Sequence, residues 1–96
     1  MITIEQAKAV LKLLKPDFDA HDFIAIYVAM YPREYLDMVL DATRENTAIL
    51  NITQVNKGIA NFLKEKTEPL NIQEVGTTQS YNILWNESKC STWKKN

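Results

Sequence analysis

The sequence is poor in cysteine, glycine and proline. Its single cysteine, Cys90, excludes an internal disulfide. The two glycines and three prolines are not clustered, which excludes a flexible linker and favours helices over an all-β fold. The longest apolar run, Phe23 to Tyr31, has nine residues, whereas a helix needs about 20 residues to cross a bilayer. We therefore expect no membrane span, and because no secretory leader pattern opens the chain, we expect a cytoplasmic protein.

An excess of charge of one sign is also missing. Eleven Lys and Arg stand against 12 Asp and Glu, so the net charge is -1. This balance excludes a disordered polyelectrolyte and a basic coat over the whole surface. With 96 residues, 46% of them hydrophobic, the chain is expected to form one domain over residues 1–96. The bases are concentrated in the second half, because residues 51–96 carry six bases and four acids.

Start signals and apolar spacing predict four helices, over about residues 3–15, 20–30, 32–44 and 52–66. Thr3 with Gln6, and Asp19 with Asp22, match the capping box, in which each side chain accepts the other residue's free backbone N–H. Pro32 suits the first position of the third helix, where its missing N–H costs nothing.

The fourth helix has a similar start signal. Asn51 with Gln54 repeats the capping spacing, and Leu50 with Val55 predicts a hydrophobic contact across the cap. The interval before it is long enough to contain a short strand at Ala48 to Leu50.

The apolar period changes after Pro69. Residues 70–75 and 80–85 alternate as strands do, and Gly76 to Gln79 suit a turn, which predicts a C-terminal β-hairpin. Residues 86–96 are left as a tail in which Trp93 pins the terminal segment onto the core. The sequence leaves open whether Ser88 to Trp93 adds a further strand or wraps the core. The expected fold class is therefore mainly α, of the α+β type, with four helices followed by a hairpin.

The outward face of the helix 52–66 carries a row of amides and amines. Gln54, Lys57, Asn61 and Lys64 share one side of that helix, and amides read base edges while ammonium groups meet phosphates. Three helices, this polar helix and a hairpin follow one another in an order that resembles a winged helix-turn-helix domain.

That resemblance implies duplex DNA as the partner, with the helix 52–66 as the recognition helix. We expect further phosphate contacts from the lysines near the end of that helix and in the tail, namely Lys66, Lys94 and Lys95. The alternative interpretation of the same row is the solvated side of a surface helix.

A second hypothesis is protein binding without catalysis. Tyr31, Tyr35 and Met38 lie among the densest aromatic and methionine content of the chain, beside Asp37 and Asp41. An apolar patch with an acidic rim suits the surface of an adaptor or small inhibitor, or the contact of a homodimer.

No enzyme, metal site or cofactor is expected. Asp17, Asp19, His21 and Asp22 are close in sequence, but from Asp17 the spacing does not fit a calcium loop. Helix capping already explains Asp19 and Asp22. Cys90 is interpreted as a small residue under the tail, and no nucleophile in a recognisable context accompanies the single histidine.

Overall fold

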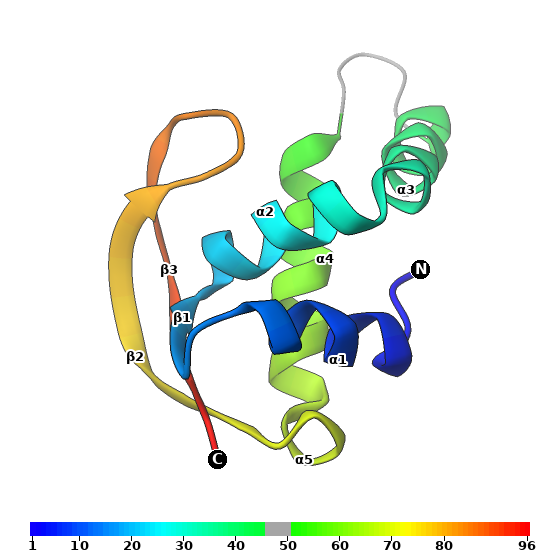
Figure 1. Ribbon diagram of the computed structural model, residues 1–96. Coiled ribbons are helices and arrows are strands. Elements are labelled where there is room, and N and C mark those ends of the chain that lie inside the picture. The colour runs from blue at the N-terminus through cyan, green and yellow to red at the C-terminus, as the bar shows by residue number, and fades with distance from the viewer. Residues whose placement is uncertain (46–50) are drawn as a thin grey trace.

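The computed structural model describes residues 1–45 and 51–96, and Figure 1 shows how their helices and strands are arranged. In chain order the elements are α1 (Ile4–Leu13), β1 (Asp17–Asp19), α2 (Ala20–Met30), α3 (Pro32–Glu45), α4 (Ile52–Glu65), α5 (Thr67–Leu70), β2 (Ile72–Tyr81) and β3 (Glu87–Lys95). The predicted mainly helical α+β class is confirmed. The strand proposed at Ala48 to Leu50, and the contact of Leu50 with Val55, lie outside the described residues.

The first two helices begin where their caps predict. Gln6 N donates to Thr3 Oγ1 and Thr3 N to Gln6 Oε1, both at 3.1 Å. At α2, Asp22 N donates to Asp19 Oδ1 at 2.8 Å and Asp19 N to Asp22 Oδ2 at 3.0 Å. Both capping boxes are thus confirmed, and Pro32 does open α3.

The capping predicted for α4 is wrong. Asn51 precedes the helix without a capping side-chain hydrogen bond. Its amide Nδ2 instead donates to the Ala42 carbonyl at 2.9 Å, so the side chain ties the start of α4 to α3. A buried Asn51 satisfies the carbonyl of a neighbouring helix rather than Gln54 N.

The sheet corrects the prediction for the last third of the chain. The order is β1-β3-β2, with both pairs antiparallel, so the predicted tail is the central strand. β1 was not predicted because three residues at a helix cap carry no period-2 signal. α5, which was also missed, is a single turn between α4 and β2.

The predicted turn at Gly76 to Gln79 is wrong because Gly76 lies within β2. It lies at a register shift between Glu74 and Gly76, and glycine inside a strand often marks such an irregularity. The true turn follows Tyr81: Trp85 N donates to the Asn82 carbonyl and Asn82 N to the Asn86 carbonyl, both at 2.9 Å. An asparagine therefore organises this turn.

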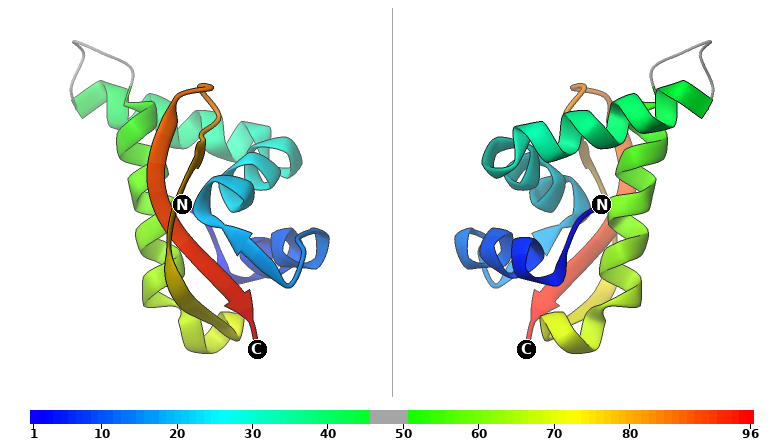
Figure 2. Two further views of the ribbon diagram at one scale, coloured as in Figure 1. Left: turned by 90° about the vertical axis from the view of Figure 1, so that its left-hand side faces the viewer. Right: turned by 90° about the vertical axis from the view of Figure 1, so that its right-hand side faces the viewer.

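Trp93 on β3 lies at the centre of the core. The core joins it to Phe18 of β1, Phe23 and Tyr27 of α2, and Ile59 of α4, with Leu63 beside them. Seen from the sheet side, α4 lies on one side of the hairpin and α1 and α2 lie on the other (Figure 2). The helices described in residues 1–45 and 51–96 include none with the length and apolar composition that a membrane crossing requires.

The two tryptophans are expected to differ sharply in their effect on stability. Trp93 is 1% exposed and Trp85 is 81% exposed. Trp93→Ala should lower the free energy of unfolding by about 3–5 kcal/mol, because it opens a large cavity. Trp85→Ala should change it by no more than about 0.5 kcal/mol. Urea unfolding followed by circular dichroism measures both, and equal midpoints for the two variants would contradict this core.

Candidate nucleic-acid interface

A groove of about 490 Å³ lies between α4, the start of α2 and the β2–β3 hairpin. Its lining contains Lys57 and Lys64 from α4, Lys89 from β3 and His21 from α2. No Asp or Glu occurs among the described residues that line it. Three ammonium groups thus line one groove in a protein of net charge -1, and the carboxylate of Glu74 lies just outside the lining, beside Lys64.

The predicted polar row stands on the outward side of α4. Lys57, Asn61 and Lys64 are exposed and also border the groove, whereas Gln54 is exposed outside it. The opposite side of the helix supplies buried core residues, including Ile59. The structure therefore brings three of the four predicted side chains to one groove and leaves all four accessible.

One of these lysines has an acidic neighbour. Lys64 Nζ lies 3.8 Å from Glu74 Oε2 of β2, and both side chains are about half exposed. Exposed ion pairs of this kind contribute roughly 0–1 kcal/mol, because water and salt screen them. Lys64 can therefore exchange this partner for a phosphate at little cost.

The remaining predicted lysines do not line the groove. Lys66 ends α4 and is half-buried, and Lys94 is exposed on β3 opposite Asp17 and Gln73. Lys95 Nζ donates to the Leu14 carbonyl at 2.5 Å, so it holds the end of α1 against the sheet. The third lysine of the groove is Lys89, which sequence reasoning missed because it assigned Glu87 to Lys95 to a tail.

The hairpin turn presents a large apolar side chain at one end of the groove. Asn82 Oδ1 accepts from Leu84 N at 2.9 Å and from Asn86 N at 3.1 Å, and Asn82 and Leu84 both line the groove. Trp85 stands at the tip with a φ of 62°, and its ring centroid lies 6.4 Å from that of Tyr81. A bulky residue in the left-handed region is strained by about 1–3 kcal/mol, and Trp85 buries little in return.

Gly58 is a second residue that the fold itself does not explain. It lies on the exposed side of α4, and a Cβ placed on it would meet nothing within 4 Å. Glycine inside a helix is less favourable than alanine by about 0.8–1 kcal/mol. A close approach of a partner to the backbone of α4 would account for it.

The residues of the protein-binding hypothesis are only partly on the surface. Tyr35 is 8% exposed, and its hydroxyl donates to Asn56 Oδ1 at 2.6 Å; burial raises the pKa of Tyr35. Tyr31 and Met38 are half-buried, and Asp37 is exposed. Tyr35 therefore belongs to the core, and the predicted patch is not continuous.

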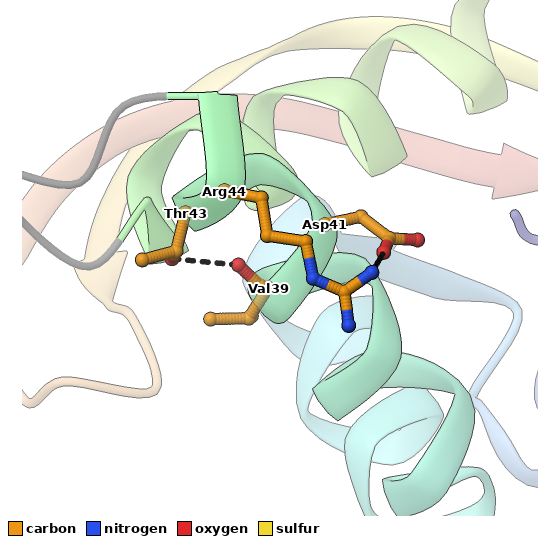
Figure 3. Close-up of polar contacts among 4 residues, drawn as sticks. All are labelled: Val39, Asp41, Thr43 and Arg44. Carbon is orange, nitrogen blue, oxygen red and sulfur yellow. Dashed lines mark hydrogen bonds and ion pairs between the residues drawn. The ribbon is translucent and has the colours of Figure 1, made fainter.

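The most exposed large apolar residues of α3 are two leucines that the predicted patch did not include. Leu36 is 55% exposed and Leu40 is 44% exposed, one helical turn apart. Near the end of the same helix, Arg44 Nη1 pairs with Asp41 Oδ1 at 3.1 Å, and Thr43 Oγ1 donates to the Val39 carbonyl at 2.7 Å (Figure 3). Asp41 thus has a partner on its own helix.

The fold is a small α+β domain whose helices and three-stranded antiparallel sheet are compatible with a winged-helix topology. No known protein family, curated protein or solved structure matches this chain significantly. Function is therefore inferred from the side chains of the groove and its surroundings.

Proposed function

We propose that this chain binds duplex DNA, with α4 in the major groove and the lysine-lined groove against one sugar–phosphate backbone. The major groove is about 12 Å wide and admits one helix, so the elements beside that helix meet the phosphates that border it. The β2–β3 hairpin is such an element, because it lies across the protein's lysine-lined groove from α4. The observation that carries the proposal is the set of three lysines that line the groove, with no Asp or Glu among the described residues of its lining.

Each side chain of this surface has a role that fits its chemistry. Lys57 and Lys64 would meet phosphates from the helix side, and Lys89 would meet them from the hairpin. The amides of Gln54 and Asn61 would contact base edges, because a carboxamide can donate to and accept from one adenine.

Gly58 and Trp85 support the same surface. Both are exposed, and both depart from local backbone preference: Gly58 lies inside a helix, and Trp85 has a positive φ. Departures from local structural preference are expected at functional sites. A glycine lets the DNA approach the backbone of α4, and the hydrogen-bonded hairpin turn offers Trp85 for contact beside the duplex.

The lysines are tested by neutralising them as a set. A Lys57→Gln, Lys64→Gln, Lys89→Gln variant is compared with Lys8→Gln, Lys12→Gln, Lys15→Gln, which removes the same charge from exposed positions on α1 and just after it. Fluorescence anisotropy with a labelled duplex at two salt concentrations reports affinity and its salt dependence.

The wild type should lose affinity with salt on a log–log slope of about -3, since three phosphate contacts release about 0.9 counterions each. The groove variant should bind more weakly with a flatter slope, whereas the α1 control should keep the slope of the wild type. Equal binding by all three proteins, or a preference for single strands over the duplex, would contradict the proposal.

Gly58→Ala should change stability and DNA affinity in opposite directions. The added methyl group meets open space, so helix propensity should raise the free energy of unfolding by about 0.5–1 kcal/mol. If DNA approaches this backbone, the same variant should bind the duplex less tightly. A variant that is more stable and binds with unchanged affinity would place the contact elsewhere on α4.

A second candidate function, protein binding through α3, is favoured by the exposure of Leu36 and Leu40. Its most direct form is a homodimer that joins two copies through this helix, which would also provide two DNA-contacting helices for a chain without excess positive charge.

The homodimer predicts a concentration-dependent mass in multi-angle light scattering. Leu36→Lys with Leu40→Lys should give a monomer at every concentration. Leu13→Lys, at a residue of α1 that is 65% exposed, serves as the control and should leave the dimer intact. A wild type that stays monomeric throughout would exclude this second candidate.

A further inference from the structure

Three side chains of the types that can bind metal ions converge at the junction of α2 with the sheet. A carboxylate oxygen of Asp19, a ring nitrogen of His21 and the Sγ of Cys90 all lie within 4.8 Å of one another. All three residues are half-buried. The convergence joins residues about 70 positions apart in the chain, so sequence spacing did not reveal it.

The pairing of β1 with β3 causes this convergence. Phe18 faces Trp93 and Asp19 faces Thr92 in an antiparallel register. Thr92 is two residues from Cys90 along β3, and His21 follows Asp19 in the first turn of α2, which contacts β3. The fold therefore brings the three side chains together from the end of β1, the start of α2 and the middle of β3.

We propose that Asp19, His21 and Cys90 bind a zinc ion. Carboxylate oxygen, imidazole nitrogen and thiolate sulfur are the three ligand types that Zn²⁺ takes in proteins, at about 2.0–2.3 Å. Around a tetrahedral ion these atoms are about 3.5 Å apart, so side-chain rotations that bring the ligand atoms closer by up to about 1.3 Å complete the site. The ion would link the end of β1 and the start of α2 to the middle of β3.

The surroundings of His21 suit a metal-binding imidazole. Its Nδ1 lies 2.6 Å from Ser80 Oγ, and its Nε2 lies 3.2 Å from Ser88 Oγ. Ser80 Oγ also lies 3.7 Å from Cys90 Sγ, so this hydroxyl connects the two ligands. When Nδ1 binds the ion in place of Ser80, the Nε2–H still donates to Ser88, which is the outer hydrogen bond that orients metal-binding histidines.

The chemistry of binding and the fourth ligand follow from this geometry. The Cys90 thiol releases its proton to solvent as the sulfur–zinc bond forms, while Asp19 and neutral His21 bind without losing one. His21 and Cys90 also line the groove, so a water molecule from the groove would supply the fourth ligand. This inference does not depend on DNA binding.

The test uses Co²⁺ as the spectroscopic probe and Zn²⁺ as its competitor, both with the full chain. Wild type with one equivalent of Co²⁺ should show the thiolate-to-cobalt charge-transfer band and the intense visible bands of a tetrahedral ion, and Zn²⁺ should abolish both. Zn²⁺ should also raise the melting temperature, because it binds the folded chain.

Two variants remove ligands, and a third serves as the control. Cys90→Ser and Asp19→Asn should weaken Zn²⁺ binding in calorimetry at least tenfold; the asparagine still caps α2. Asp22→Asn alters the same capping box but no ligand, so it should bind Zn²⁺ as the wild type does. Absent cobalt bands, or calorimetric binding that Cys90→Ser and Asp19→Asn leave unchanged, would overturn the proposal.

Discussion

The position of β3 between β1 and β2 is the constraint on which the rest of the structure depends. This pairing carries the last residues of the chain back to residues 17–19 and buries Trp93 among residues of α2 and α4. It also holds the hairpin against α2, so that Lys89 faces Lys57 and Lys64 across one groove. The contact of α2 with β3 brings His21 near Cys90. One strand thus positions the core, the groove and the cluster of Asp19, His21 and Cys90.

The distribution of charge and local strain separates the proposed DNA-binding surface from the rest of the fold. Capping at Thr3 and Asp19, and the Lys95 contact with Leu14, satisfy polar groups and stabilise the fold. Gly58 and Trp85 lower the stability of the fold instead. Alanine would suit the helix better than Gly58, and glycine would suit the positive φ of Trp85 better than tryptophan. Proteins are only marginally stable, so about 1 kcal/mol is a substantial share of the free energy of unfolding. Exposed residues that lower stability by this much therefore favour a role in binding.

Local sequence signals predicted the helices well because caps and apolar stripes act within a few residues. The start of α2 at Asp19 and of α3 at Pro32 follow from such signals. The prediction of the strands failed for a physical reason. The segment Glu87–Lys95 is mostly polar, and the β1 residues with which it pairs are distant in sequence. Gly76 suits a register shift as well as a turn, and only tertiary pairing decides between them. Accordingly the α4 row was predicted, whereas Lys89 and the approach of Cys90 to His21 were not.

The most direct test of DNA binding at this surface is a titration of the ¹⁵N-labelled chain with a short duplex, followed by amide chemical shifts. We expect the largest changes along the outward side of α4 and at the tip of the hairpin, near Asn61 and Trp85, with α1 unchanged. Changes confined to α1 and α3, or no changes at a concentration of duplex far above that of the protein, would contradict it.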